Sequence, residues 1–315
     1  MVMPEKRIWW NGEMVPERRA LVPVTQLGWT GVEAVFEGMR GYYNAEQEEL
    51  FVFRLDEHLH RLMRSMRLMG MTPRWEREEL IEACRRVLRE NDCRQDVYLQ
   101  PLAYVPDAAG GRFFESRGCE ISIDWWPAPS RLGDDHVETA RVSSYRRIGE
   151  DTMPPRVKTL SNYRNSRLAT REARRDGYDT AILLNGAGHV AEAPTACVFL
   201  VRDGVVVTPD LTSGILESIT RDAIIILCRE ALGLEVRERV VDRSELYCAD
   251  EVFVVGNAVE VTPLAAIDGF VIGDGTAGPI TRQCRRLLHD VARGLVPDFV
   301  AWRAPVALRA AAAAG

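Results

Sequence analysis

The chain has 315 residues, a formal net charge of −6 at pH 7, 46% hydrophobic residues and 27% charged residues. This length allows two domains with sizeable cores, the composition is typical of a globular protein, and the negative charge gives no basic surface for nucleic acid. No apolar run reaches the roughly 18 residues of a membrane span and the first residues lack the apolar core of a signal peptide, so we expect a cytoplasmic protein.

The first part of the chain alternates predicted strands and helices. Residues 8–16 predict a hairpin, because Asn11-Gly12 supplies the two positive φ angles of a type I′ turn. Strands are predicted over 34–43, 50–54, 96–104 and 120–126, and amphipathic helices over 56–69 and 76–91. We therefore expect a small N-terminal α/β domain over residues 1–130, followed by a linker over 131–139, where proline, glycine and aspartate are frequent.

The second part is richer in predicted strands. Hairpins are expected over 179–192 and 197–209, and further strands over 235–241 and 251–260. A helix is predicted over 218–232, and its first turn suits either an anion such as phosphate or a plain N-cap. Small residues follow the strand 251–260, so that backbone amides could approach a ligand closely. These elements predict a larger C-terminal domain over 140–302 and a low-complexity, frayed tail over 303–315.

Lysine is rare in this chain. Only two of its 40 basic residues are lysines, Lys6 and Lys158. Arginine can replace lysine on most surfaces, but it does not lose its proton and cannot bond covalently to an aldehyde through an amine. A retained Lys158 among apolar and hydroxyl residues therefore suggests a covalent amine, whereas a chance remnant of an arginine-rich composition is the alternative.

Metal and nucleotide sites are not predicted. The seven cysteines are odd in number and form no C-x-x-C pair, so we expect free thiols. His58 and His60 are two residues apart on a predicted helix, so they point in different directions, and both are expected to be exposed. The pair Gly186 and Gly188 lacks the third glycine of a dinucleotide fingerprint.

Nine sequence blocks, in order and spacing, resemble those of the branched-chain amino acid aminotransferases and, more broadly, of the pyridoxal-phosphate enzymes of fold type IV. The resemblance covers residues 8–284 and implies an α/β, two-domain fold (α+β) with a larger, strand-rich C-terminal domain that binds pyridoxal phosphate. The blocks are Asn11-Gly12-Glu13, Val35 to Arg40, Phe53 to His58 with Arg61-Leu62, Lys158 with Asn162-Tyr163, Glu172 to Asp179, Val190 to Glu192, Leu216 to Arg221, Ala249 to Phe253 and Glu260 to Pro263.

The resemblance also implies roles for single residues toward pyridoxal 5'-phosphate. Lys158 would hold this cofactor covalently and act as the general base, and Glu192 would face the pyridine nitrogen. Tyr163 would contact the phenolic oxygen, and Arg61 would pair with the phosphate. The remaining phosphate-binding positions would be Ser218, Ile219, Thr220 and Asn257.

On the substrate side, the resemblance implies four lining positions. Phe36, Arg40, Tyr98 and the amides around Ala258 would line the pocket, the last three near the substrate carboxylate. Otherwise, Phe36 and Tyr98 would be ordinary core residues, and Arg40 and Glu192 surface ion pairs.

Five positions depart from the family pattern and bear on substrate choice. Gln100 stands where the bacterial branched-chain enzymes have an arginine that helps accept the side-chain carboxylate of glutamate, which makes glutamate doubtful as the amino donor. Thr30 replaces a tyrosine, Ser218 a glycine, Asn257 a threonine and Cys197 an asparagine. Because hydroxyl and amide groups still donate to phosphate, we expect cofactor binding to survive these changes.

The expected function is thus an aminotransferase that acts on an apolar, branched-chain-like L-amino acid and a 2-oxo acid, as a homodimer, without metal, membrane or nucleic acid. The alternatives are another fold type IV activity, such as a specialised biosynthetic, D-amino acid or amine transaminase or a lyase, and a non-catalytic relative that only binds. Retention of Lys158, Glu192 and Arg61 together argues against the last of these.

Overall fold

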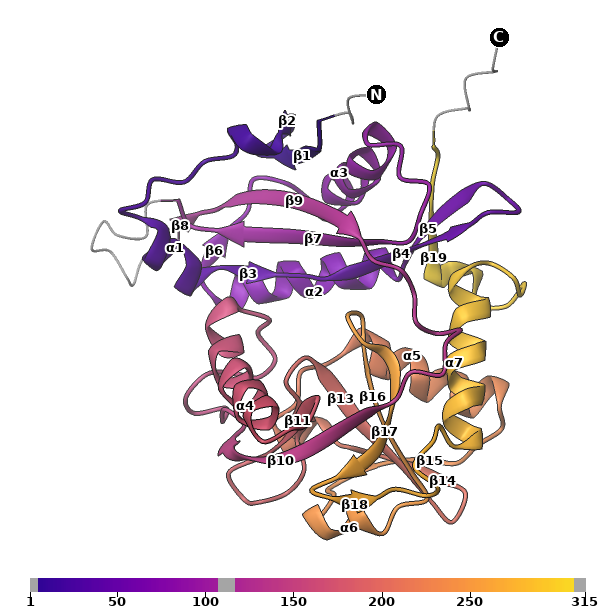
Figure 1. Ribbon diagram of the computed structural model, residues 1–315. Helices are drawn as coiled ribbons and strands as arrows, with labels where there is room; N and C mark the ends of the chain where they lie inside the picture. The colour runs from indigo at the N-terminus through magenta and orange to yellow at the C-terminus, as the bar shows by residue number, and fades with distance from the viewer. Residues whose placement is uncertain (1–4, 107–116, 309–315) are drawn as a thin grey trace. The chain divides into compact units, whose positions relative to one another are not determined.

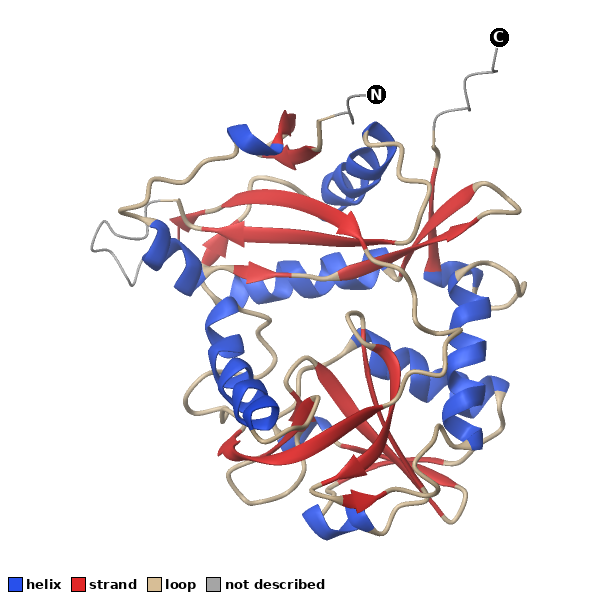
Figure 2. Ribbon diagram, in the orientation of Figure 1, coloured by secondary structure: helices blue, strands red, loops and turns tan. Residues whose placement is uncertain are grey.

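The computed structural model describes residues 5–106 and 117–308, which form two compact units (Figures 1 and 2). The first unit comprises residues 1–129, 158–161 and 291–315, and the second comprises 130–157 and 162–290. The predicted domains were consecutive in the chain, whereas here a four-residue segment around Lys158 and the C-terminal residues belong to the first unit. None of the helices in the described ranges is long and apolar enough to cross a membrane.

The first unit is built on an eight-stranded sheet in the order β19-β5-β4-β7-β9-β1-β2, with β3 paired to β7, and on a small β6–β8 ladder. The strands are β1 Arg7–Trp10, β2 Glu13–Pro16, β3 Val35–Phe36, β4 Met39–Asn44, β5 Glu49–Phe53, β6 Met71–Thr72, β7 Val97–Tyr104, β8 Arg117–Gly118, β9 Glu120–Pro127 and β19 Arg303–Val306. The predicted turn between β1 and β2 is confirmed, since φ is 51° at Asn11 and 101° at Gly12.

Its helices are α1 Leu27–Glu33, α2 Leu55–Leu68 and α3 Arg77–Glu90. Both predicted amphipathic helices are confirmed by α2 and α3. A capping box between Glu76 and Glu79 fixes the start of α3. The side chain of each residue accepts the backbone N–H of the other. Helix α2 contacts β3 and α3, and its inward face is almost completely buried.

The strand predicted over residues 34–43 is interrupted at Glu37 and Gly38, which separate β3 from β4. A side chain at Gly38 would overlap with the hydroxyl of Tyr98, and the carboxylate of Glu37 points to buried partners on α2. The break therefore has a physical cause, since the backbone leaves the ladder to make room for these two side chains.

The C-terminal tail was predicted to be frayed over residues 303–315, and this is wrong for its beginning. Strand β19 pairs antiparallel with β5, with Arg303 opposite Phe53 and Val306 opposite Leu50. The ring of Trp302 packs edge-on against Phe53, with 5.9 Å between centroids. Burial of Trp302 and Val306 explains why this segment is ordered; residues 309–315 lie outside the described residues.

The second unit is built on a nine-stranded sheet in the order β11-β10-β17-β16-β13-β14-β15, with β12 paired to β13 and β18 to β17. The strands are β10 Glu138–Arg146, β11 Thr180–Leu184, β12 Glu192–Ala193, β13 Ala196–Arg202, β14 Val205–Pro209, β15 Val236–Arg239, β16 Glu251–Gly256, β17 Glu260–Ile267 and β18 Phe270–Val271. Its helices are α4 Tyr163–Arg175, α5 Ile219–Ile226, α6 Arg243–Tyr247 and α7 Pro279–Ala292. Figure 1 shows α4 beside β10 and β11.

Two predictions in this unit have different outcomes. The hairpin 197–209 is confirmed by β13 and β14, whose turn residues Asp203 and Gly204 both have positive φ. In the hairpin predicted over 179–192, Leu184 and Val190 form only an isolated antiparallel bridge, and Gly188 is the residue with positive φ in the loop. Asn185 donates its backbone N–H to His189 and so closes a longer loop.

Candidate functional site

The predicted site residues are distributed over both units. The first unit contains Phe36, Arg40, Arg61, Tyr98, Gln100 and Lys158, and the second contains Tyr163, Glu192, Ser218, Ile219, Thr220, Asn257 and Ala258.

Lys158 begins the short segment 158–161 that lies along β3. Its backbone N–H donates to the hydroxyl of Ser65 at 3.3 Å, and its carbonyl accepts the N–H of Phe36 at 3.0 Å. Two residues later, the N–H of Leu160 donates to the carbonyl of Ala34 at 2.9 Å. The backbone of Lys158 is thereby fixed on both sides, so that only its side chain is left to move.

The ammonium group of Lys158 lies over the ring of Phe36, with 4.6 Å from Nζ to the centroid. A cation over an aromatic face is attracted by the ring quadrupole, by about 0.5–2 kcal/mol. The residue is half-buried, and Phe36 itself is buried. The amine of Lys158 thus lies against an aromatic ring, and its covalent role stays a prediction.

A buried ionic cluster of Glu37, His58 and Arg61 lies next to this segment. Arg61 donates Nε–H and Nη2–H to the two oxygens of Glu37 at 2.6 and 2.7 Å, and His58 Nδ1 lies 2.8 Å from Glu37 Oε2. His58 and Glu37 are 0% exposed. The expectation of an exposed His58 is therefore wrong, whereas Arg61 lies on the buried face of α2.

The pKa values of Glu37 and His58 are both lowered in this cluster. Burial alone would raise the pKa of Glu37, but the bidentate Arg61 and the His58 hydrogen bond outweigh it and lower that pKa to about 2. Burial lowers the pKa of His58, and the positive charges of Arg61 and Lys158 act in the same direction. We therefore assign an ionised Glu37 that accepts a hydrogen bond from a neutral His58.

Four predicted substrate-side residues share one face of the first sheet. Arg40 lies opposite Tyr98, and Tyr98 lies opposite Trp126 in the ladder. Side chains alternate along a strand, so every second residue of β7 points to the same side: Tyr98, Gln100 and Leu102. Leu102 is the ladder partner of Phe36. The register thus brings Phe36, Arg40, Tyr98 and Gln100 to one face.

Contacts on this face define its chemistry. The rings of Tyr98 and Trp126 stack with centroids 4.9 Å apart. The guanidinium of Arg40 is buried and donates to the carbonyl of Ala128 at 2.7 Å. Gln100 lies opposite Asp124, whose carboxylate pairs with Lys6 at 2.6 Å. The face combines aromatic walls with a neutral amide at position 100.

In the second unit, Glu192 is the buried carboxylate with the most defined surroundings. Its Oε1 pairs with Arg147 Nη2 at 2.8 Å, and its Oε2 accepts the backbone N–H of Leu216 at 2.9 Å. Both Glu192 and Arg147 are less than 10% exposed. Arg147 also donates Nε–H to the carbonyl of Gly214. The direction of the Glu192 carboxylate is thus set from two sides.

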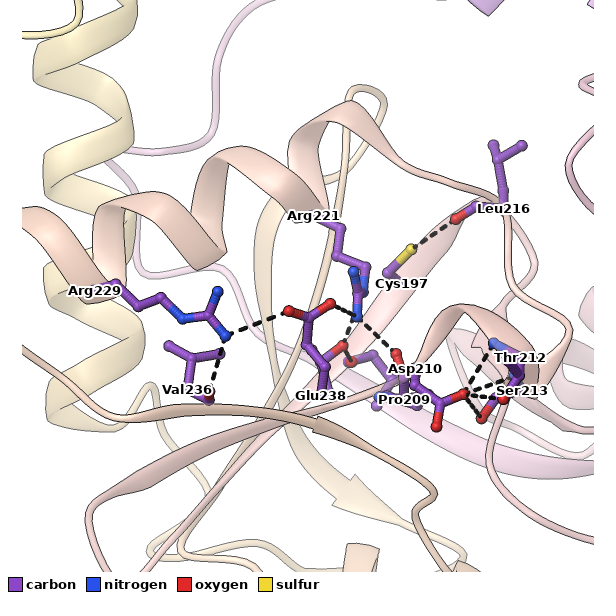
Figure 3. Close-up of polar contacts among 12 residues, drawn as sticks. Cys197, Pro209, Asp210, Thr212, Ser213, Leu216, Arg221, Arg229, Val236 and Glu238 are labelled. Atoms are coloured by element: carbon purple, nitrogen blue, oxygen red, sulfur yellow. Dashed lines mark hydrogen bonds and ion pairs between the residues drawn. The ribbon is translucent and has the colours of Figure 1, made fainter.

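Cys197 contacts the backbone of Leu216 in turn. The Cys197 thiol lies 3.9 Å from the carbonyl of Leu216 (Figure 3), and the N–H of Leu216 donates to Glu192. Sulfur is a weak donor, and Cys197 is buried on β13 opposite Glu192. The cysteine found where the family pattern has asparagine therefore still supports the loop that contacts Glu192.

The predicted phosphate positions lie at the start of α5 and at the turn after β16. Ser218 is the N-cap of α5, and its hydroxyl accepts the N–H of Arg221 at 3.2 Å. Thr220 Oγ1 donates to Asn257 Oδ1 at 3.4 Å, so the helix start and the turn are joined. The N–H groups of a first helical turn attract anions.

Arg221 anchors this helix start to the sheet, as Figure 3 shows. It is buried and donates to the carbonyl of Pro209 at 2.8 Å, to Glu238 at 3.0 Å and to the hydroxyl of Thr208 at 3.3 Å. Strands β14 and β15 therefore hold α5 through one guanidinium.

Sequence reasoning missed four of these residues, Glu37, His58, Arg147 and Arg221. Helical spacing could have placed His58 on the buried face of α2, because it is four residues from Leu62 and three from Arg61. No local pattern distinguishes Arg147 from the many other arginines, since its partner Glu192 is 45 positions away.

Comparison with known proteins was consistent along the chain. Residues 34–267 match the family model described as Amino-transferase class IV. The chain is 39% identical to a probable branched-chain-amino-acid aminotransferase of Aquifex aeolicus (94% of this chain, 95% of that protein) and 38% identical to the branched-chain-amino-acid aminotransferase of Escherichia coli K12 (94% and 96%). It is similar to the crystal structure of the PLP-form of branched-chain amino acid aminotransferase from Thermobaculum terrenum, with TM-score 0.94, 48% identity and coverage of 97% and 100%.

Proposed function

Because this chain belongs to the amino-transferase class IV family, we propose that it transfers an amino group between an L-amino acid with an apolar, branched-chain-like side chain and a 2-oxo acid. Pyridoxal 5'-phosphate is the cofactor. The observation that carries this proposal is the fixed backbone of Lys158 with its amine over Phe36. A protein that only binds a ligand would need no such lysine.

The residues present suit this cofactor in their chemistry. An aldehyde needs an amine, which is Lys158, and a ring nitrogen needs a buried carboxylate, which is Glu192. A phosphate needs N–H and hydroxyl donors, and the start of α5 with Thr220 and Asn257 provides them. When bound, pyridoxal phosphate supplies an electron sink for the charge left on the substrate's Cα.

We assign two tasks to Lys158. Its amine would hold the cofactor covalently, and the same amine, once free, would take up the proton of the substrate's Cα as a general base and later give it up again as a general acid. The hydrogen bonds to Ser65 and Phe36 hold the backbone while the flexible side chain moves. Tyr163, the first residue of α4, is assigned to the cofactor's phenolic oxygen by resemblance.

Glu192 and Arg61 are assigned to opposite ends of the cofactor. Glu192 holds a proton at the ring nitrogen, and Arg147 with the Leu216 N–H orients its carboxylate. Arg61 binds the phosphate, and Glu37 fixes the plane of its guanidinium through two hydrogen bonds. The N–H groups of Ile219 and Thr220, at the start of the helix that Ser218 caps, add to the phosphate site.

The substrate side is assigned to the face that contains Phe36, Arg40, Tyr98 and Gln100, together with the amides near Ala258. Aromatic rings and a neutral amide favour an apolar amino acid side chain, because no polar group of the substrate is then left unpaired.

Gln100 leads to a prediction about the amino donor. We expect Gln100→Arg to raise kcat/KM for L-glutamate about tenfold or more, because a charge-assisted hydrogen bond to the second carboxylate contributes about 1.5–3 kcal/mol. Single-turnover conversion of the cofactor by L-glutamate and by L-leucine measures this. The control is Gln100→Met, which changes shape without charge. Equal gains for both substrates in Gln100→Arg would contradict the role.

The reaction itself is tested by visible absorption of the protein with pyridoxal phosphate, before and after single L- or D-amino acids without any 2-oxo acid. We expect branched-chain L-amino acids to convert the lysine-bound form to pyridoxamine phosphate. Faster conversion by D-amino acids would favour the D-amino acid alternative, and a bound cofactor that no amino acid converts would favour a lyase.

We further propose that the enzyme is a cytoplasmic homodimer. Support for the dimer comes from apolar side chains exposed in the first unit, with Leu21 72%, Val24 84% and Leu27 59% exposed. Such surface is typical of association, and a second copy is the occupant we assign. Light scattering should give the mass of a dimer, and Leu27→Asp should shift it toward the monomer. A monomeric wild type would overturn this proposal.

A further inference from the structure

Glu260, the first residue of β17, has an unusual backbone conformation for its type. Its φ is 56°, in the left-handed region, and the residue is 2% exposed. For a residue with a side chain, this conformation costs on the order of 1 kcal/mol or more and persists only where the surroundings fix it. The side-chain contacts of Glu260 therefore require an explanation.

Both carboxylate oxygens of Glu260 hold the entry to the linker. Oε1 accepts the hydroxyl of Ser130 at 2.7 Å, and Oε2 accepts the backbone N–H of Arg131 at 2.7 Å. These two residues are the first of the second unit, because the chain passes out of the first unit after Pro129. From the other side, Arg285 donates to the carbonyl of Arg131.

The backbone of Glu260 also closes the turn that contains Asn257 and Ala258. Glu260 pairs with Gly256 across the ladder of β16 and β17. A side chain at Gly256 would come within 2.8 Å of the carbonyl of Thr195, so the near side of the turn is tightly packed. On its far side the turn ends at Glu260, and Thr262 Oγ1 donates to the carbonyl of Val259 at 2.7 Å. One residue thus connects the turn and the linker entry.

We propose that Glu260 is a positioning residue that couples the linker entry, Ser130 and Arg131, to the turn at Asn257 and Ala258. The inference rests on the proposed function, in which this turn holds the cofactor phosphate and the substrate carboxylate. When the carboxylate of Glu260 is lost, the turn relaxes and both groups bind less tightly. The chemical step at Lys158 is unaffected.

Trypsin tests the structural half of this proposal. Arg131 is exposed and Leu132 is buried, so cleavage after Arg131 requires the linker entry to open. We expect Glu260→Gln to speed this cleavage at least about fivefold, as followed by mass spectrometry of that peptide. Ser130→Ala, which keeps the Arg131 N–H contact, should give a smaller increase. An unchanged rate in Glu260→Gln overturns the proposal, whatever the enzyme's activity.

A glycine variant distinguishes the effect of the Glu260 carboxylate from the effect of the left-handed backbone conformation. Glu260→Gly relieves the left-handed strain but loses both carboxylate hydrogen bonds, so the two effects oppose each other and we expect the variant to fold with a melting temperature within a few degrees of the wild type. We expect it to raise KM for the amino acid about tenfold and to lower kcat by less than twofold. Full retention of KM, or loss in kcat alone, would show that Glu260 does not position the turn.

The coupling is also measurable without catalysis, because linkage is reciprocal. Pyridoxal phosphate, or inorganic phosphate at high concentration, should slow cleavage after Arg131 in the wild type and not in Glu260→Gly. Equal protection of both overturns the coupling. If the wild type converts no amino acid, the proposed function fails, and these protection rates still decide whether Glu260 couples the two segments.

Discussion

Lys158→Arg is expected to reduce amino transfer by at least about a thousandfold while the protein keeps its fold and charge. Arginine retains a positive group over the ring of Phe36 but neither bonds covalently to an aldehyde nor accepts a proton at neutral pH. The backbone contacts of residue 158, to Ser65 and to β3, do not depend on the side chain. Cofactor affinity should fall, and the melting temperature of the protein without added cofactor should change little.

The rarity of lysine makes this result easy to assign. Borohydride reduction of the protein with pyridoxal phosphate, followed by mass spectrometry, should label the peptide of Lys158 and leave Lys6 unlabelled. Lys6→Arg is the matched control, since Lys6 pairs with Glu17 at 3.0 Å and Asp124 at 2.6 Å and is assigned no chemistry. Label at Lys6, or turnover retained in Lys158→Arg, would contradict the assignment.

Local elements of this fold could be predicted because their causes are local. The Asn11-Gly12 turn depends on two residues that accept positive φ, and the buried stripe of α2 follows from apolar residues at helical spacing. The resemblance to a known family added the order of the domains and the cofactor. Fold class, activity and cofactor therefore agreed with the later comparisons.

Long-range pairing was not predictable from local pattern. Strand β19 joins β5 across about 250 residues, and its sequence beside an alanine-rich tail gave no sign of a partner. Residues 158–161 join β3 although both flanking segments belong to the second unit. In each case the pairing is determined by burial against an element that is distant in the sequence. Local strand propensity carries no information about such a partner.

The site shows the same division. Lys158 was found from composition, since its chemistry belongs to one side chain. Glu37 and Glu260 were not, because their importance lies in what they hold at a distance: Arg61 in one case, Ser130 in the other. Buried carboxylates become recognisable only once their partners are known.

Glu37→Gln is expected to lower the free energy of unfolding by about 3–5 kcal/mol, the cost of removing one partner from a buried ion pair. The amide cannot accept two hydrogen bonds from Arg61 and one from His58, so Arg61 is left buried without its counterion. Urea unfolding at pH 7 measures the loss. The double variant with Arg61→Met, which removes both charges, should recover part of this loss. No recovery would mean that lost packing, and not the unpaired charge, causes the loss of stability.

The pH dependence gives an independent check on the same cluster. Because the folded pKa of Glu37 is lowered from 4.5 to about 2, its stabilisation is complete above pH 4.5 and is lost as the pH falls toward 2. The pKa of His58 is lowered below 6.5 by burial, so its contribution is likewise lost as the pH falls below 6.5. We therefore expect wild-type urea midpoints to decline below pH 6.5 and more steeply below 4.5. In Glu37→Gln the second decline should be shallower, and an unchanged slope between pH 4.5 and 3 would contradict an ionised Glu37 in the folded protein.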